Sequence, residues 1–190
     1  MSKKTIWITG GSTGIGKALA IKFANKGWNV AVSARRVELL DDLSKNYENI
    51  SSFPLDVTDK AKCIEVFNQI KTKFENIDIC FFSTGTWNPK KEKEIDVEQM
   101  EDVFKVNFFG TVNSIKAVEQ YYRERKKGII TIVSSIAGYR GLPNSTGYGP
   151  SKSALNNLAE SLYFDFQRYN VRVCLAVSYT HLTLPTKSTV

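Results

Sequence analysis

Cysteine and histidine are scarce in this sequence of 190 residues, which contains three cysteines and one histidine. Cys63, Cys80 and Cys174 lie far apart, are odd in number and follow no metal-ligand spacing. Disulfide frameworks need paired cysteines, and structural zinc sites need cysteine or histidine at short fixed spacings. We therefore expect three reduced cysteines in or near the core, and no metal site.

Long apolar runs are also missing, since no segment reaches the roughly 18 consecutive apolar residues of a membrane-spanning helix. The N-terminal residues lead directly into the apolar segment Thr5–Thr9, which leaves no room for the apolar region of a signal peptide. We therefore expect a cytoplasmic protein that does not enter a membrane.

Acidic residues are outnumbered by basic ones, and the formal net charge is +7. Such a surplus is compatible with nucleic-acid binding, but acidic residues intersperse the lysines, as in Lys60–Lys73 and Lys90–Lys93. The sequence also lacks a nucleic-acid recognition motif. We expect no nucleic-acid partner, and the charge alone identifies no function.

Segments of two periodicities alternate along the chain. Apolar and β-branched runs, typical of buried strands, cover Thr5–Thr9, Trp28–Ser33, Ile50–Leu55, Ile77–Phe82, Ile129–Ser134 and Val171–Val177. Helical periodicity covers Ile15–Lys26, Val37–Tyr47, Lys60–Phe74, Val97–Tyr122 (with room for a break) and Ser151–Tyr169. This alternation predicts a parallel sheet covered by helices on both faces. Right-handed crossovers then give one α/β domain, a doubly wound Rossmann-type sheet that binds ligands at the carboxyl ends of its strands.

A glycine-rich turn joins the first predicted strand to the first predicted helix. Its glycines permit positive φ and let the backbone approach a pyrophosphate, while N–H groups at the helix N-terminus face the anion. A purely structural turn is the alternative, but this position at the start of an alternating pattern favours a dinucleotide site. The predicted cofactor-binding residues of the turn are Gly10, Ser12, Thr13, Gly14, Ile15 and Gly16.

The end of the second predicted strand bears on which dinucleotide binds. NAD-binding proteins of this fold carry an acidic residue there for the ribose 2′-hydroxyl, whereas this chain has Ala34 followed by Arg35 and Arg36. A guanidinium matches the geometry of a phosphate, so the two arginines favour NADP over NAD. The alternative is that both arginines are solvated loop residues.

The glycine spacing, Thr-Gly-x-x-x-Gly-x-Gly, resembles that of the short-chain dehydrogenase/reductase family. The resemblance implies further cofactor contacts. Asp56 and Val57 match the family's adenine-binding pair, although Asp56 could instead cap a turn or a helix. Where the family carries Asn-Ala-Gly, this chain has Ser83-Thr84-Gly85. Gly85 keeps the small residue beside the nicotinamide ribose, but the other two residues depart from the pattern and put local rigidity in question.

Tyr148 and Lys152 are four residues apart at the opening of a helix, so their side chains share one helical face. The pKa of a free phenol is about 10. A neighbouring ammonium favours the phenolate and lowers this pKa, which suits proton exchange near neutral pH. The pair matches the family's Tyr-x-x-x-Lys motif, with an ordinary exposed helix pair as the alternative. Family spacing also matches Ser135, thirteen residues before Tyr148, and Asn107 in the preceding helix.

The resemblance implies hydride transfer between NADP(H) and a carbonyl or alcohol substrate. Ser135 would hold the carbonyl oxygen, and Tyr148 would donate its proton. Lys152 would assist that proton transfer and bind the nicotinamide ribose, and Asn107 would hold a water that relays protons to solvent. The cofactor would supply the hydride, and the protein orientation and electrostatics.

Other properties are less determined by the sequence. Trp87, Asn88 and the segment Gly138–Gly147 either border the substrate or are plain loop residues. Family members are often homodimers or homotetramers, and their substrates are too varied for the fold to identify one. A catalytically silent nucleotide-binding or scaffold protein of the same fold is the alternative function.

The sequence after Ala176 departs from the family. Relatives continue with a Pro-Gly turn, helices that shape the substrate pocket and a seventh strand, whereas Val177–Val190 resembles a translated sequencing adapter. We expect an incomplete NADP-binding domain at residues 1–176, its sheet truncated after the sixth strand, and a non-native tail at 177–190. His181 is then no catalytic candidate. We expect the chain as written to be unstable or inactive, because buried apolar surface is missing.

Overall fold

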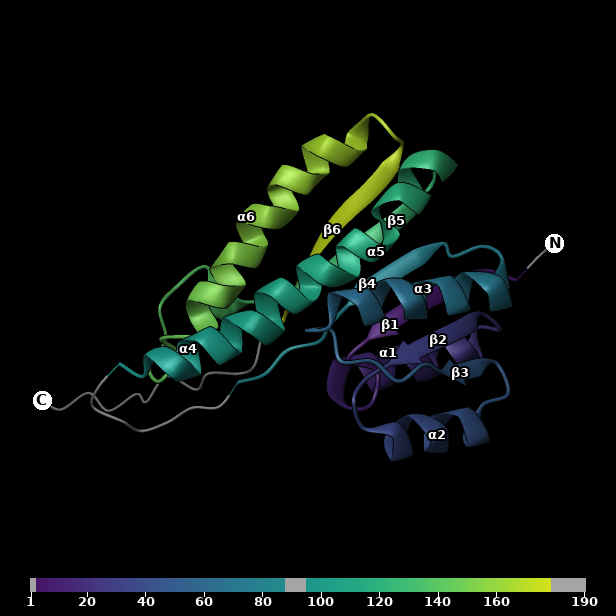
Figure 1. Ribbon diagram of the computed structural model, residues 1–190, viewed down its shortest axis with the longest axis horizontal. Coiled ribbons are helices and arrows are strands. Elements are labelled where there is room, and N and C mark those ends of the chain that lie inside the picture. Colours follow the sequence, from purple (N-terminus) through teal and green to yellow (C-terminus); the bar gives the residue numbers. More distant parts are fainter. Residues whose placement is uncertain (1–2, 88–94, 179–190) are drawn as a thin grey trace, which may run out of the picture.

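The computed structural model describes residues 3–87 and 95–178. These ranges hold a parallel sheet with helices on both faces (Figure 1). Its strands are β1 (Thr5–Thr9), β2 (Asn29–Ser33), β3 (Ile50–Ser52), β4 (Ile79–Phe82), β5 (Gly128–Ser135) and β6 (Val171–Ser178). Their spatial order is β3-β2-β1-β4-β5-β6, and every neighbouring pair is parallel. This confirms the predicted doubly wound α/β sheet. Asn88 and His181 lie outside the described residues.

The helices alternate with these strands. They are α1 (Gly14–Asn25), α2 (Val37–Asn46), α3 (Lys60–Phe74), α4 (Val97–Phe104), α5 (Gly110–Arg125) and α6 (Tyr148–Gln167). The long segment predicted from Val97 to Tyr122 is interrupted by a π-helical segment, Lys105–Phe109, through which α4 and α5 continue as one rod (Figure 1). α6 begins three residues before the predicted Ser151, because its apolar periodicity starts only after the first turn.

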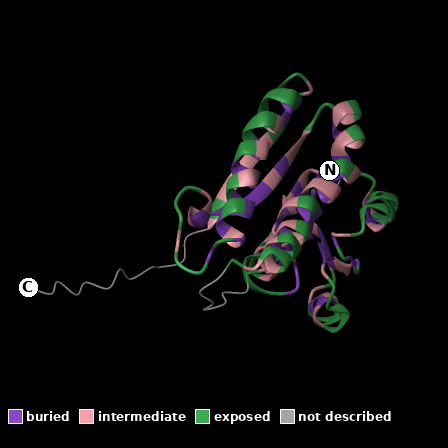
Figure 2. Cartoon of the chain, turned by 60° about the vertical axis from the view of Figure 1, so that its left-hand side comes forward, coloured by how far each residue is buried: buried purple, intermediate pink, exposed green. Residues whose placement is uncertain are grey.

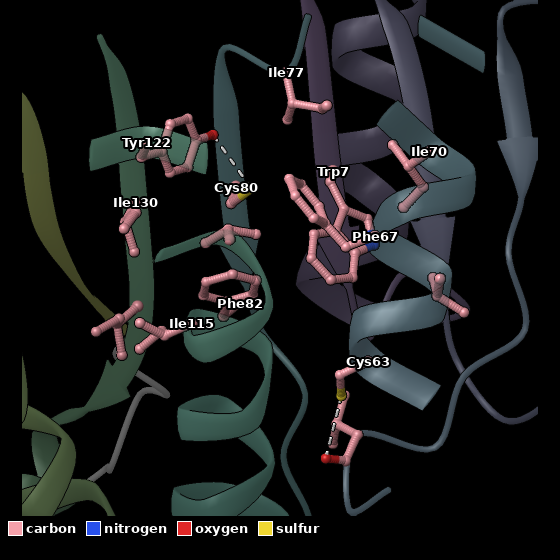
Figure 3. Packing of buried hydrophobic residues seen from close by; sticks show 14 of the residues in the cluster. Trp7, Cys63, Phe67, Ile70, Ile77, Cys80, Phe82, Ile115, Tyr122 and Ile130 are labelled. Carbon is pink, nitrogen blue, oxygen red and sulfur yellow. Dashed lines mark hydrogen bonds between the residues drawn. The ribbon is translucent and has the colours of Figure 1, made fainter. Parts of the chain in front are cut away.

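The two faces of the sheet bury separate apolar clusters. Ile6 and Ile8 of β1 pack with α1 and α2, whereas Trp7 packs with α3, α5 and α6 on the other face. This division follows from the alternation of side chains along a strand. Figure 3 shows the Trp7 ring beside Phe67 of α3 and Phe82 of β4, with ring centres 5.8 and 5.7 Å away. Buried residues therefore gather on the strands and on the inward sides of the helices (Figure 2).

All three cysteines are free, as the sequence predicts. Burial raises the pKa of the Cys63 thiol to about 11 and that of Cys80 to about 12, so both are poor nucleophiles near neutral pH. Cys80 also accepts a hydrogen bond from the Tyr122 hydroxyl (Figure 3). None of the helices described here combines the length and the apolarity needed to cross a membrane.

Candidate active site

The order of the strands creates a crevice. The chain adds strands outward from β1 to β3 and then returns to the other side of β1 for β4, so the crossovers diverge between these two strands. Ligands of such sheets bind outside the carboxyl ends of the strands at this point. A cavity of about 480 Å³ lies there. It is lined by Gly10, Ser12–Gly16, Ala34–Arg36, Leu55–Val57, Ser83–Thr86, Val106 and Val133. Every residue predicted to bind the cofactor, other than Tyr148 and Lys152, is among them.

The turn after β1 depends on its glycines. Gly10 has φ of +71° and Gly14 has φ of +56°, conformations that favour glycine. A Cβ at Gly10 would lie 2.9 Å from the backbone of Ser83, and a Cβ at Gly16 would meet the carbonyl oxygen of Gly10. The turn therefore folds tightly against itself and against the end of β4. The N-terminus of α1, which begins at Gly14, faces the cavity.

Ser83 connects the ends of β1 and β4, the two strands that flank the crevice, by hydrogen bonds. Its hydroxyl donates a hydrogen bond of 2.6 Å to the carbonyl oxygen of Thr9, and its backbone N–H lies 3.3 Å from the same oxygen. Where the family carries asparagine, this serine therefore connects the ends of β1 and β4 by a side-chain hydrogen bond.

Arg36 lies over the glycine turn. Its Nη2 donates hydrogen bonds to Ser12 Oγ at 3.1 Å and to Thr13 Oγ1 at 2.9 Å. Arg35 also lines the cavity, where Ala34 leaves no carboxylate at the end of β2. Both arginines therefore line the cavity, and the Arg36 guanidinium is held at the glycine turn.

The sequence leaves two roles open for Asp56, that of a cofactor contact and that of a cap, and its position is compatible with both. Its Oδ1 accepts hydrogen bonds from the N–H and the hydroxyl of Thr58, so it caps a turn, and it also lines the cavity. Partial burial raises the pKa of Asp56, but the Thr58 hydrogen bonds and the charges of Arg35 and Lys105 outweigh this effect and lower it overall. Among the described residues lining the cavity, Asp56 is the only acid, and it stays ionised.

Tyr148 and Lys152 meet on one face of α6, as their spacing predicts. Lys152 Nζ lies 5.6 Å from the centre of the Tyr148 ring and donates a hydrogen bond of 3.0 Å to the carbonyl oxygen of Val133. Lys152 is only 4% exposed, and burial lowers its pKa to about 8. A Cβ at Gly85 would lie 3.5 Å from this amine, so Gly85 joins the pair to the cavity. The Trp87 ring lies 5.8 Å from that of Tyr148.

Asn107 lies fully buried in the π-helical segment and connects two other parts of the chain. Its Oδ1 accepts from the N–H of Thr86 at 2.7 Å, and its Nδ2 donates to the Thr86 carbonyl at 3.0 Å and to Ser151 Oγ at 3.1 Å. Ser151 in turn donates to the carbonyl oxygen of Tyr148. Asn107 therefore joins the segment after β4 to the first turn of α6, and its relay of a water stays a prediction.

Ser135 ends β5, as its sequence position indicates. It is 7% exposed, and its Oγ accepts a hydrogen bond of 3.2 Å from the N–H of Ala137 in the short 3₁₀ turn Ile136–Gly138. The carbonyl oxygen of Ala137 lies 3.1 Å from where a Cβ of Gly149 would be. The turn after Ser135 thus packs directly on the start of α6, which carries Tyr148.

Sequence reasoning missed several groups of the site. Thr86 and Ser151 hold Asn107, and the carbonyl oxygen of Val133 holds the Lys152 amine. No motif marks them, because the interactions use backbone atoms or a hydroxyl whose partner is distant in sequence. Its place directly before Lys152 in the chain is the signal that could have indicated Ser151.

Known proteins resemble this chain along most of its length. Residues 4–188 match a family model described as short chain dehydrogenase. The 3-dehydrosphinganine reductase of Danio rerio is 33% identical over 178 residues, covering 89% of this chain and 54% of the relative. The NADPH-dependent 1-acyldihydroxyacetone phosphate reductase of Schizosaccharomyces pombe is 33% identical over 175 residues, covering 90% and 58%. The chain thus spans about half the length of the curated relatives it matches.

A solved structure agrees with the fold. The structure described as "ElxO with NADP Bound" is 29% identical, has a TM-score of 0.86 and covers 91% of this chain and 72% of that one. With the family model matching nearly the whole sequence, the chain belongs to the short chain dehydrogenase family.

Proposed function

We propose that the protein is an NADP-dependent oxidoreductase that transfers a hydride between NADP(H) and a carbonyl or alcohol substrate. The observation that carries this proposal is the pairing of Tyr148 with the buried amine of Lys152, 5.6 Å from its ring centre, next to Gly85 at the cavity. A phenol and an amine in this arrangement can exchange a proton with a substrate oxygen beside a dinucleotide.

The cavity fits a phosphorylated dinucleotide. The glycine turn of Gly10 and Gly16 brings backbone close to the cavity, and the N-terminus of α1 suits a pyrophosphate. Arg35 and Arg36 suit the additional phosphate of NADP, and the relative named as NADPH-dependent and the NADP-bound neighbour support this choice. Asp56 and Val57 would border the adenine.

When bound, NADPH supplies the hydride, with two electrons, that adds to the carbonyl carbon. Tyr148 donates its phenolic proton to the oxygen, which becomes the alcohol hydroxyl, and the Ser135 hydroxyl holds the same oxygen. Lys152 would bind the ribose next to the nicotinamide, and it places a positive charge beside the phenol. With a pKa of about 8 it is mostly protonated at pH 7. Asn107 keeps Thr86 and the first turn of α6 in register.

The substrate would approach from the side of the loop that follows Ser135. A second cavity, of about 630 Å³, is bordered mainly by that loop, by Ile95 and Met100, and by the start of α6. Apolar groups such as Leu142 predominate in it, which suits a carbonyl compound with an apolar body. We also propose assembly as a homodimer or homotetramer, in which exposed rings such as those of Phe109 and Phe164 could become buried. The free cysteines fit the reducing cytoplasm.

The proposal is tested by NADPH oxidation with acetone, ethyl acetoacetate, acetophenone and cyclohexanone. Turnover by the wild type would also contradict the expectation that the chain as written is unstable or inactive. We expect Tyr148→Phe to lower the turnover with the most active ketone by about 100-fold or more, while the Kd of NADPH changes less than about threefold. Tyr163→Phe, an exposed position on the same helix, is the matched control and should keep full activity.

Two outcomes would contradict the proposal. Substantial turnover by Tyr148→Phe would remove the phenol from the chemistry. Binding of NADPH without oxidation by any ketone would favour a silent nucleotide-binding protein, the alternative to which the unusual Ser83-Thr84-Gly85 segment points in the sequence.

A further inference from the structure

Ser135 and Tyr148 must act on one substrate oxygen, yet they come from different elements. Ser135 ends β5 and Tyr148 begins α6, and the connecting loop is largely exposed, with Tyr139 61% exposed. A loop of this kind does not fix the distance between its ends. Direct contacts between the end of β5 and α6 must therefore hold the two hydroxyl groups in place.

A buried polar network makes this contact. The Ser134 hydroxyl lies within hydrogen-bond distance of the carbonyl oxygen of Lys152, at 3.2 Å, and of Asn156 Oδ1. Asn156 Nδ2 donates a hydrogen bond of 3.2 Å to the carbonyl oxygen of Gly138. Ser134 is fully buried and Asn156 is 7% exposed, so each of these polar groups depends on the others for partners.

The network also fixes a close approach of two backbones. A Cβ at Gly138 would lie 2.9 Å from the carbonyl carbon of Lys152 and 2.9 Å from Asn156 Nδ2. The turn Ile136–Gly138 is thereby pressed against the turn of α6 that carries the amine. Because Ser135 Oγ accepts from the N–H of Ala137 in that same turn, the position of the turn determines the position of Ser135.

We propose that Asn156 is a positioning residue, which holds Ser135 against Tyr148 and Lys152 through its hydrogen bonds to Ser134 and Gly138. Asn156 follows Lys152 by one helical turn on the same face, so Tyr148, Lys152 and Asn156 form one stripe along α6. Asn156 does not line the dinucleotide cavity, and it acts only through the turn. This inference rests on the proposed function, because it assigns Ser135 to the substrate oxygen.

The test compares Asn156→Leu, close in size but without hydrogen bonds, with Asn157→Leu at the adjacent exposed position. A displacement of about 1 Å in a reacting group can cost about 100-fold in rate, so we expect kcat of Asn156→Leu to fall by about 10- to 100-fold. The Kd of NADPH should change less than about threefold, and Asn157→Leu should match the wild type. The assay uses the most active ketone of the panel.

A second readout separates positioning from loss of folded protein. With NADPH deuterated at the transferred hydrogen, Asn156→Leu should show a larger isotope effect on kcat than the wild type, because hydride transfer becomes slower than the other steps. A merely destabilised protein would lose active molecules without changing this isotope effect. Ser134→Ala removes only a small hydroxyl and serves as the milder variant in case Asn156→Leu does not fold. It should shift the isotope effect in the same direction.

The outcomes distinguish the two proposals. If Tyr148→Phe is inactive while Asn156→Leu and Ser134→Ala keep the wild-type kcat and isotope effect, Asn156 is not a positioning residue and the proposed function stands. If Tyr148→Phe is as active as the wild type, or the wild type oxidises NADPH with no ketone, the proposed function fails and the role of Asn156 fails with it.

Discussion

The amine of Lys152 donates its hydrogen bond to the carbonyl oxygen of Val133, from within a site where the lysine is 4% exposed. This single acceptor does not replace the water that an ammonium group loses on burial, and the pKa of Lys152 is therefore lowered to about 8 from 10.5. The folded protein therefore bears an energetic cost at Lys152, a residue that we propose takes part in catalysis.

That cost predicts how stability depends on pH. Below about pH 8 the lysine is charged in both the folded and the unfolded state, and the folded state bears the full penalty. Above 10.5 it is neutral in both states and the penalty is absent. Between these values the unfolding free energy of the wild type should rise, relative to Lys152→Met, by up to about 3 kcal/mol.

Urea unfolding followed by tryptophan fluorescence across this pH window measures the difference. Using the difference between two variants cancels the tyrosines and other groups that titrate in the same range. Lys22→Met, an exposed lysine of α1, should keep a constant difference from the wild type. A pH-independent gap for Lys152→Met would mean that the buried amine is not the source of the penalty.

The hydrogen bonds from Arg36 to Ser12 and Thr13 predict which cofactor loses affinity when the arginine is removed. A hydrogen bond to a charged group contributes about 1.5–3 kcal/mol, so Arg36→Leu should weaken NADPH binding by about 10- to 100-fold. NADH lacks the additional phosphate, and its Kd should change by less than about threefold. Quenching of protein fluorescence by each cofactor gives both constants.

Removal of any positive charge weakens anion binding slightly, so this prediction needs a charge-matched control. Arg172→Leu removes the same charge at the start of β6, at the opposite end of the sheet from the cavity. It should leave the ratio of the two dissociation constants unchanged. Equal losses for NADPH and NADH in Arg36→Leu would show that the arginine does not distinguish them.

The fold is predictable where local signals define an element. β1 spans Thr5–Thr9 as predicted, because its apolar run ends at a glycine turn. α3 spans Lys60–Phe74 as predicted, and Asp59 caps it by accepting a hydrogen bond from the N–H of Lys62. β3 ends at Ser52, before the predicted Leu55, although the N–H of Leu55 still bonds to the carbonyl of Ala34.

Tertiary contacts set what the sequence could not predict. The π-helical segment occurs where Asn107 bonds to Thr86 and to Ser151, and neither partner can be inferred from the helical periodicity. The side chains proposed to react can be named from the sequence, because their chemistry requires particular residue types. Their supports are not, since the carbonyl oxygen that holds Lys152 is available at any residue, and Val133 provides it through its position in β5.

Gly16 predicts a local effect on cofactor binding. A Cβ at Gly16 would clash with the carbonyl oxygen of Gly10, so Gly16→Ala must displace the turn that we propose faces the pyrophosphate. We expect the Kd of NADPH to rise by more than about tenfold, since a backbone hydrogen bond to a charged phosphate contributes about 1.5–3 kcal/mol. Gly141→Ala, where a Cβ meets nothing within 4 Å, should bind NADPH normally. Unchanged binding by Gly16→Ala would mean that the turn does not hold the cofactor.

Trp7 and Ser33 predict a cost in stability away from the site. Trp7 Nε1 donates a hydrogen bond of 2.9 Å to Ser33 Oγ, and both residues are at most 1% exposed. Ser33→Ala leaves the indole N–H without this partner in the core, which should lower the unfolding free energy by about 1–3 kcal/mol. Ser44→Ala is the control, because the hydrogen bond of its hydroxyl runs within its own helix to the carbonyl oxygen of Leu40, and its effect should stay within about 0.5 kcal/mol. Equal unfolding free energies for the two variants would contradict this prediction, because they would mean that the indole N–H has another partner when the Ser33 hydroxyl is absent.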